Sequence, residues 1–237
     1  ADVIDYPLKV FKKGQQWVTY LPIPLTAKVG DYTITATISH GEVMDQTLHT
    51  TIHVVDKTFK ESRITVDAKT KALKTQDTLD ELQVALDTAR KNPVQENLMD
   101  GPMIQPTEGR ISTEYGLMRY VNDKYESRHN GIDIATPTGS PVVAAQNGVV
   151  VYAGLLTATG NTLIIDHGQN IFTIHYHLNK IDVAVGDPVK KGDLVAEVGT
   201  TGFSTGPHLH WCIWVNGAYV NPWQMMDTTN PIHLGMQ

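Results

Sequence analysis

Short segments of β-type residues, separated by glycine and proline turns, recur along almost the whole chain. Between residues 10 and 66 apolar and polar residues alternate within these segments, as in 32–38 (YTITATI) and 50–55 (TTIHVV). From residue 109 onward the β-type segments return and dominate, for example at 162–165 and 210–215. Period-two alternation and many β-branched residues predict strands. We therefore expect a mostly β fold.

The 237 residues are enough for two domains of modest size. The alternating strands of residues 1–68 predict a small immunoglobulin-like β-sandwich that serves as an accessory domain. Residues 102–237 are expected to form a second, larger domain built on an antiparallel β-sheet. Within it, the Gly-x-Pro-Val turns at 139–142 and 186–189 repeat each other, which favours a duplicated hybrid, lipoyl-like hammerhead arrangement.

Between these domains the sequence period changes. Apolar side chains recur at helical spacing, so residues 69–101 are predicted to be a linker that contains one helix at about 77–92. Asp77 or Thr78 is expected to cap this helix, with Glu81 completing a capping box.

Charge and cysteine content exclude several classes of protein. Lys and Arg number 19 against 25 Asp and Glu, so the net charge of −6 argues against nucleic acid or an anionic membrane as the main partner. Cys212 is the single cysteine, which excludes an internal disulfide and the Cys-rich zinc folds. No apolar run approaches the roughly 18 residues that a membrane-spanning helix needs. A metal site would have to be built from His with Asp or Glu.

Six of the ten histidines lie between residues 129 and 210. Three clusters gather there: His129 with Asp133, His175 with His177, and His208 with His210. Side chains two apart on a strand point to the same face, so each His-x-His pair is expected to line one groove wall. Gly131 and Ile132 disfavour a helix, so a turn must bring the first pair together. Two nitrogens and one oxygen with an open position describe a catalytic zinc site.

Two motifs resemble those of a known family. The segments His129-Asn-Gly-Ile-Asp133 and Ser204-Thr-Gly-Pro-His-Leu-His210 are similar to the HxxxD and HxH signatures of the LytM/lysostaphin-type metallopeptidases, family M23. Further elements of the family pattern occur in order at residues 114–116, 139–144, 166–168, 176–178 and 199–206. The resemblance covers about residues 102 to 227, and its ordered elements make chance similarity improbable.

The resemblance implies a zinc ion, one per chain, with His129, Asp133 and His210 as its ligands. It also implies that His177 and His208 handle the proton of the attacking water and the developing oxyanion. Bound zinc lowers the pKa of water to about 7 and polarises a peptide carbonyl. We expect His208 to be the general base and His177 the oxyanion stabiliser, and the reverse assignment stays open.

Four other side chains near the motifs are candidates for catalytic or structural roles. His175 stands where the family has an aromatic residue, so a structural role, a substrate contact and a role as an alternative base all stay open. Tyr125 is a candidate donor to the tetrahedral intermediate. His167 is expected to shape a turn, and Cys212, two residues beyond the HxH motif, to be a small buried hydrophobe.

By its resemblance the chain is expected to be a zinc metalloendopeptidase that hydrolyses cross-bridge or stem peptides of bacterial cell-wall peptidoglycan. A non-hydrolytic wall-binding or regulatory protein is the alternative. A cupin-type metal barrel is disfavoured, because no acidic residue follows the His-x-His pair closely. We expect a monomer that acts outside the cytoplasmic membrane, in the envelope or extracellularly, although the first residues lack signal-peptide features. The N-terminal domain is expected to position the peptidase.

Overall fold

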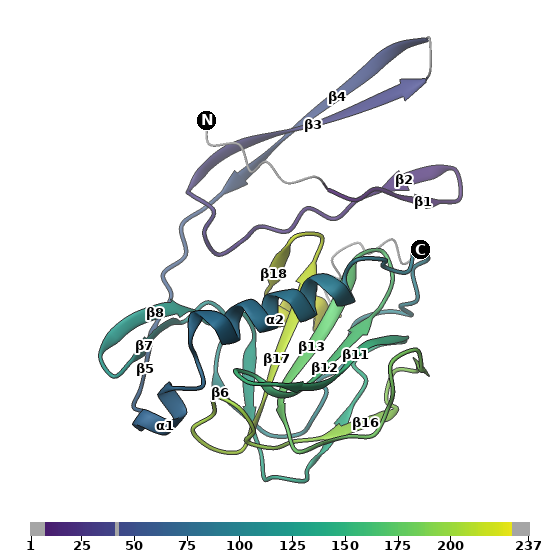
Figure 1. Cartoon of the computed structure of the whole chain (residues 1–237). Helices are drawn as coiled ribbons and strands as arrows, with labels where there is room; N and C mark the ends of the chain where they lie inside the picture. Colours follow the sequence, from purple (N-terminus) through teal and green to yellow (C-terminus); the bar gives the residue numbers. More distant parts are fainter. Residues whose placement is uncertain (1–7, 41–42, 229–237) are drawn as a thin grey trace.

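The computed structural model describes residues 8–40 and 43–228, which form a mostly β protein, as predicted, and contain three helices where one was predicted. Its centre is an eight-stranded antiparallel sheet with the strand order β15-β11-β12-β13-β17-β9-β6, and β18 pairs with β17 (Figure 1). The strands of this sheet are β6 (Arg110–Thr113), β9 (Ile132–Ala135), β11 (Gly148–Leu156), β12 (Gly160–Asp166), β13 (Ile171–Leu178), β15 (Pro188–Val189), β17 (His208–Val215) and β18 (Ala218–Val220).

Two smaller sheets flank the central one. The strands β10 (Pro141–Val143), β16 (Leu194–Glu197) and β14 (Lys180–Ile181) form an antiparallel sheet. The strands β5 (Glu61–Ile64), β7 (Met118–Val121) and β8 (Lys124–Arg128) form the other. Here β5 pairs with β7 in parallel and β8 pairs with it antiparallel. The strand β5, which precedes the predicted linker, is thus part of the same sheet as β7 and β8.

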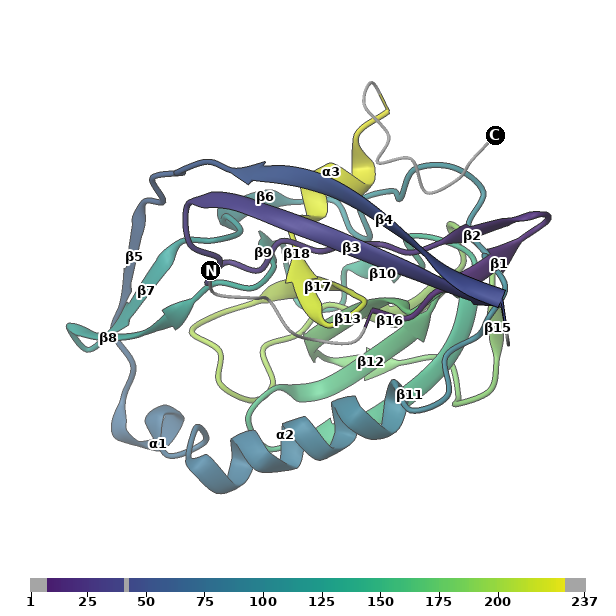
Figure 2. The same cartoon turned by 90° about the horizontal axis from the view of Figure 1, so that it is seen from above.

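The central strands are buried on both faces. On one face Leu163, Ile165 and Trp211 belong to the larger apolar cluster. On the other face Ile164 and Phe172 pack with the helix α2 (Gln76–Ala89), which lies alongside β11 (Figure 2). Burial of each such large side chain contributes about 1.5–3 kcal/mol, so the sheet and its covering helix form one stable unit.

The cap of α2 differs from the prediction. Thr75 is the N-cap residue, with extended backbone angles, and its side chain accepts a hydrogen bond from the Thr78 backbone N–H. The Thr78 hydroxyl accepts in return from the Thr75 N–H, which completes the capping box. The predicted roles of Asp77 and Glu81 are wrong, because the helix begins earlier and the Glu81 carboxylate accepts from the Thr157 N–H at 3.0 Å.

The remaining helices are short: α1 (Ala68–Lys71) and α3 (Pro222–Met226). In the described part of the chain, no helix combines the length and apolar character that crossing a membrane requires.

The predicted linker at residues 69–101 is not a free tether in the structure. The apolar side of α2 is buried against the sheet, because Leu86 and Ala89 need an apolar partner and find it there. The segment after the helix is also attached, since the Val94 N–H donates to the Asp166 carboxylate at 2.7 Å and the Leu98 N–H to the His167 carbonyl at 3.1 Å. These residues are part of the same body as the sheet.

The N-terminal part forms two hairpins, and the predicted immunoglobulin-like sandwich is not confirmed. One hairpin joins β1 (Phe11–Lys13) to β2 (Gln16–Val18), and the other joins β3 (Gly30–His40) to β4 (Val43–Val54). In the described residues β3 and β4 pair only with each other, and their hairpin stands clear of the central sheet (Figure 1). Two strands offer no second sheet on which a sandwich core can close.

The segment that follows β2 anchors this part to the sheet domain. Tyr20 is buried in the larger apolar cluster, and its hydroxyl donates to the Gln169 side chain at 2.6 Å. The Asn216 side chain accepts from the Lys9 N–H at 3.0 Å and donates to the Tyr20 carbonyl at 3.0 Å. The two chain segments therefore dock through defined contacts.

Candidate metal centre

Strand pairing brings together three segments that are distant in sequence. The register of β17 with β9 sets His210 opposite Asp133. His129 lies just before β9, where its N–H donates to the Leu117 carbonyl at 2.9 Å. The turn between them passes so close to β17 that a Cβ on Gly131 would lie 2.3 Å from a backbone oxygen, so only glycine fits. The expected turn geometry of this motif is thereby present.

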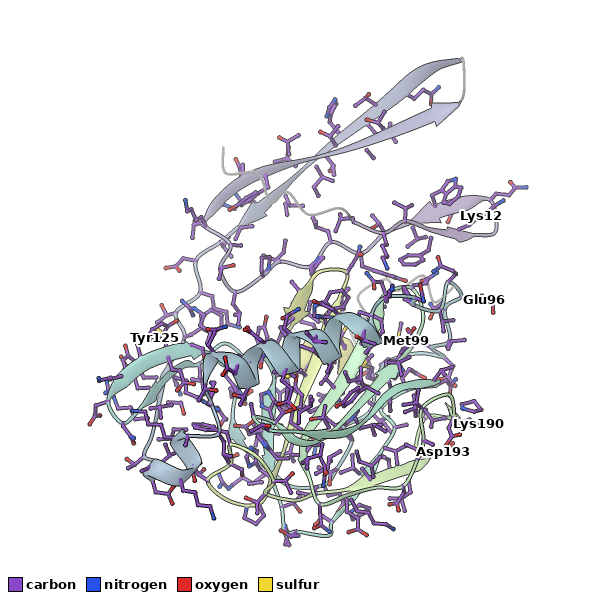
Figure 3. The ribbon with its side chains drawn as sticks, viewed as in Figure 1. Lys12, Glu96, Met99, Tyr125, Lys190 and Asp193 are labelled. Carbon is purple, nitrogen blue, oxygen red and sulfur yellow. The ribbon has the colours of Figure 1, made fainter. Side chains whose placement is uncertain are left out.

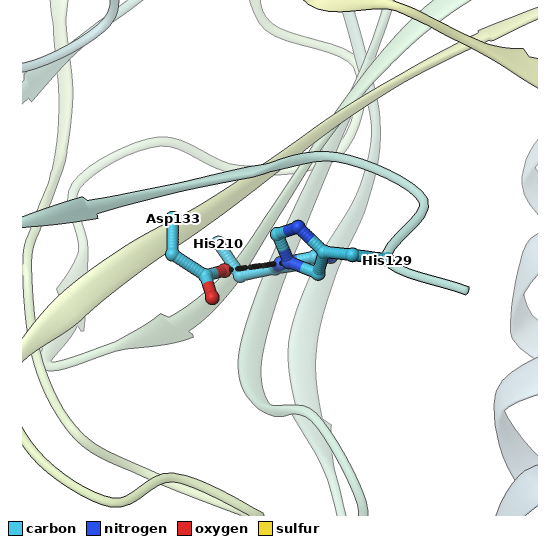
Figure 4. Close-up of side chains that lie close together, drawn as sticks. All are labelled: His129, Asp133 and His210. Carbon is cyan, nitrogen blue, oxygen red and sulfur yellow. Dashed lines mark hydrogen bonds and ion pairs between the residues drawn. The ribbon is translucent and has the colours of Figure 1, made fainter. Parts of the chain in front are cut away.

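The donor atoms of His129, Asp133 and His210 converge on one point (Figure 4). His129 Nε2 lies 2.9 Å from Asp133 Oδ1 and 2.9 Å from His210 Nδ1. His210 Nδ1 lies 2.6 Å from the same carboxylate oxygen. Among the described residues this is the group of His, Cys, Asp or Glu side chains whose geometry could hold a metal ion.

The outer hydrogen bonds of the two histidines determine which nitrogens face this point. His129 Nδ1–H donates to the Glu114 carbonyl at 2.9 Å, since a carbonyl oxygen can only accept. His210 Nε2–H donates to the Asn130 side-chain oxygen at 3.1 Å. Each neutral ring therefore directs a bare nitrogen toward a carboxylate oxygen. Three electron-pair donors in contact require a cation between them, and such outer partners are typical of metal-binding histidines. The residues fit a divalent ion.

Burial and charge keep Asp133 and His210 in the state that a metal needs. All three side chains are buried. Burial alone would raise the pKa of Asp133, but its close contacts with the His210 and His129 rings hold it well below its usual range. Burial lowers the pKa of His210 to about 4, although Asp133 opposes the shift. A carboxylate and a neutral imidazole are the protonation states that bind metal.

His177 and His208 lie beside this centre, in a pocket of about 300 Å³. Their ring centroids are 4.8 Å apart, and His208 Nε2 is 3.8 Å from Asp133 Oδ1. His177 Nδ1–H donates to the Thr201 carbonyl and His208 Nδ1–H to the Gly206 carbonyl, both at 2.8 Å. In its neutral form each ring therefore has an Nε2 that accepts. Burial, helped by the His208 and His210 charges, lowers the pKa of His177 to about 3.

The structure separates His175 from His177, so the prediction that they line one wall is wrong. His177 has a φ of 63°, a left-handed backbone angle that breaks the alternation of β13. His175 is fully buried, pairs in register with Leu163 and Trp211 of the larger apolar cluster, and its Nδ1 lies 3.3 Å from the Leu163 carbonyl. Its place in the core gives it a structural role.

Tyr125 and Cys212 also have defined places. Tyr125 is 56% exposed on β8, packs edge-on against Tyr120, and is not among the residues that line the pocket (Figure 3). Cys212 is fully buried, as predicted, and its sulfur lies 2.9 Å from His210 Nε2. Burial raises the pKa of this thiol well above its usual value, so it packs as a neutral group.

Three contacts at the centre were not predicted from the sequence. The Glu114 backbone and the Asn130 side chain orient the two histidines, and they lie within the matching motifs. Arg119 is different: its Nη2 donates to Asp133 Oδ2 at 3.0 Å, and its side chain lines the pocket. Its position on β7 gives no sequence signal of its own, because the contact depends on how two sheets pack.

Comparison with known proteins agrees with this geometry. Residues 127–222 match Peptidase family M23. The chain is 36% identical over 132 residues to the DD-carboxypeptidase/endopeptidase Mpg of Neisseria meningitidis serogroup B, a match of 52% of this chain and 30% of that protein. It is 40% identical over 113 residues to the peptidoglycan DD-endopeptidase ShyA of Vibrio cholerae, a match of 47% of this chain and 26% of that protein. The chain thus spans less than a third of either relative.

A solved structure extends the likeness of fold to nearly the whole chain. The putative peptidase M23 from Pseudomonas aeruginosa superposes with a TM-score of 0.63 at 23% identity, over 94% of this chain and 84% of that one. At this identity the likeness concerns the fold alone. The part of the chain that carries the metal-centre motifs, residues 127–222, is thus similar to peptidase family M23.

Proposed function

We propose that this chain is a zinc metalloendopeptidase that hydrolyses peptide bonds of bacterial cell-wall peptidoglycan. The observation that carries the proposal is the convergence of bare His129 and His210 nitrogens on one oxygen of Asp133. Two nitrogens and an oxygen are the donor set of catalytic zinc sites that keep a position open. The relatives' names, a DD-carboxypeptidase/endopeptidase and a peptidoglycan DD-endopeptidase, support the substrate class.

A zinc ion bound there would polarise the scissile carbonyl and make an attacking water acidic enough to react near neutral pH. The protein supplies the proton transfers around it. We assign His208 as the general base, because its accepting Nε2 is 3.8 Å from Asp133 Oδ1 and its ring is fixed by the Gly206 carbonyl. The proton that it accepts is then available for the leaving amine.

His177 is the second histidine beside the metal centre, and we assign it to stabilise the developing oxyanion. Its Nδ1–H is committed to the Thr201 carbonyl, so only Nε2 faces the pocket. A bare nitrogen cannot donate to an oxyanion. His177 therefore acts in this role only with a second ring proton taken up from solvent, because the proton of the attacking water passes through His208 to the amine.

The pocket suits an extended peptide. Its walls include Ile64 of β5, the free edge of β6 at Ser112 and Thr113, and the loop at Phe203. β6 pairs only with β9 among the described strands, so its outer edge can hydrogen-bond to a substrate backbone. A wall-peptide substrate places the protein in the cell envelope or outside the cell, where we expect it to act as a monomer.

The test is digestion of purified peptidoglycans that differ in cross-link type, with zinc and with a chelator, followed by mass spectrometry of the products. New amino termini should appear with zinc and disappear with chelator or with His208→Ala. His49→Ala is the matched control, because His49 is an exposed histidine on β4 and its loss should leave the products unchanged.

The products identify the bond that is cut in the cross-bridge or stem. If the protein takes up zinc but releases no new amino termini from any wall type, the hydrolase assignment is wrong and a wall-binding or regulatory role replaces it. If wild-type protein takes up no zinc, the assignment of the metal centre is wrong as well.

A further inference from the structure

The two carboxylate oxygens of Asp133 have separate partners. Oδ1 faces the nitrogens of His129 and His210, whereas Oδ2 accepts from Arg119 Nη2 at 3.0 Å. A zinc ligand of this type can bind through one oxygen or through both. A guanidinium N–H occupies one lone pair of Oδ2, and Oδ1 is the oxygen that faces the two histidine nitrogens at the centre.

The Arg119 side chain is held for this contact at an energetic cost. It is only 18% exposed, and its Nε–H is buried without an acceptor among the described residues. Breaking a hydrogen bond to water without replacing it costs about 1–3 kcal/mol, and buried ion pairs add little net stability. Stability of the fold is therefore a poor explanation for an arginine at this position.

The strand that carries Arg119 is fixed on both sides. In β7 the residue pairs with Ser62 of β5 on one edge and with Ser127 of β8 on the other. The N-terminal part of the chain thus helps to place the guanidinium, through the parallel β5 strand. Asp133, which accepts the hydrogen bond from Arg119, is also fixed, because its backbone in β9 pairs with both β17 and β6.

We propose that Arg119 is a positioning residue that restricts Asp133 to one metal-binding oxygen and places a positive charge beside the ion. This inference depends on the proposed metal centre. Both effects reduce the negative charge that Asp133 offers to the ion and keep one of the ion's positions free. Arg119 thus favours the reactivity of the bound metal over the tightness with which the metal is held.

The direction of the expected effect is unusual. Outer partners that accept a hydrogen bond from a ligand strengthen metal binding, and their loss typically weakens it about 10- to 100-fold. Arg119 instead donates to a ligand and carries a charge of the same sign as the ion. Arg119→Met should therefore bind zinc more tightly, by about tenfold, because a repulsion is removed and Oδ2 becomes a second donor. Arg119→Lys keeps the charge and should change the affinity less.

The experiment measures zinc affinity of the full chain by competition with a chromophoric chelator, and the visible absorption of the cobalt(II) form. An additional oxygen donor raises the coordination number, so cobalt in Arg119→Met should absorb several-fold less strongly than in wild type. Arg128→Met is the matched control, since it removes a nearby positive charge on β8 that contacts the Gly116 carbonyl and the Phe59 ring. Its affinity and spectrum should match the wild type.

An unchanged cobalt spectrum in Arg119→Met, or a zinc affinity equal to or weaker than that of wild type, would overturn the proposal. Weaker affinity with a lower unfolding midpoint would assign Arg119 a merely structural role. These outcomes are distinguishable from failure of the proposed function. Without a metal centre the wild-type protein itself would bind neither metal, and a lack of hydrolysis alone would leave the affinities and spectra as expected.

Discussion

The central sheet and the β3–β4 hairpin are both built from β-branched residues, yet they have opposite environments. Ile164 and Ile174 in the sheet are fully buried, with a strand on each side and apolar clusters above and below. Ile34 and Ile52 in the hairpin are half-buried, and their strands have one partner each among the described residues. An isolated hairpin is marginally stable in water. Similar local sequence therefore yields a rigid scaffold in one place and an exposed ribbon in the other.

The comparison explains where the chemistry is located. The metal-centre side chains come from β9, β17 and the turn before β9, whose registers are fixed by strands on both sides. Side-chain positions must hold within about 0.5 Å for a metal or catalytic site. A hairpin with two free edges cannot provide that precision, although it also carries histidines.

The largest expected effect is loss of a metal-centre histidine. His210→Ala removes one of three donors and leaves Asp133 and His129 in contact without their partner. We expect zinc binding to fall below detection and kcat/KM on a wall peptide to drop at least about a thousandfold, equivalent to roughly 4 kcal/mol of transition-state stabilisation. Metal analysis and peptide-release kinetics measure both.

His53→Ala in the hairpin is the control for that change. It removes an exposed histidine that contacts Asp31 only across the ribbon. Zinc content and kcat/KM should equal those of wild type. If His210→Ala retained zinc at wild-type occupancy, the assignment of the centre would have to move elsewhere.

The same contrast shows what the sequence could predict. The resemblance of the two motifs to a known family implied the group of His129, Asp133 and His210, which the structure brings together. Strand parity placed His208 and His210 on one face, and both lie near the Asp133 carboxylate. The mostly β class and the position of the helix follow from equally local patterns. The fold class and the helix need no knowledge of how distant segments pack.

Features that depend on long-range packing were not predictable. The left-handed φ of His177 overrides strand parity, and nothing in a non-glycine residue indicates it. Arg119 reaches Asp133 because β5, more than fifty residues earlier, pairs in parallel with β7. The sandwich expected for the N-terminal part rested on alternation, which describes a half-buried strand without saying what covers it.

A core substitution should reveal the rigidity of the sheet. Ile164→Ala removes buried methyl groups from the cluster that joins β12 to α2. The loss of burial and the cavity left behind should lower the free energy of unfolding by about 2–5 kcal/mol. Urea unfolding followed by tryptophan fluorescence measures the change. A loss well below about 1 kcal/mol would show that this face of the sheet is not tightly packed.

Buried histidines should make the stability of the sheet depend on pH. Burial lowers the pKa of His167 to about 4, although its hydrogen bond to the Asn147 carbonyl opposes the shift. Below about pH 6.5 the unfolded chain takes up a proton that the folded chain refuses until about pH 4, so stability falls as pH drops through this window. From about pH 7 to about pH 5 the loss due to this residue should be about 2 kcal/mol.

His167→Gln isolates that contribution. Its free energy of unfolding, measured in chelator so that metal binding does not intervene, should depend less steeply on pH than that of wild type. His49→Gln, on the exposed hairpin, should keep the wild-type slope. Equal slopes for wild type and His167→Gln would mean that His167 is protonated in the folded protein at mildly acidic pH.

The smallest expected effect tests the hairpin directly. Ile52→Ala makes in β4 the same change that Ile164→Ala makes in β12, but the side chain is half-buried and, within the described part of the chain, the strand pairs with β3 alone. Little apolar surface leaves water there, so the free energy of unfolding should fall by less than about 1 kcal/mol. A loss as large as that of Ile164→Ala would mean that another surface covers this face in solution. The unfolding midpoint would then depend on protein concentration if that surface belonged to a second copy, and a constant midpoint would indicate a contact within the same chain.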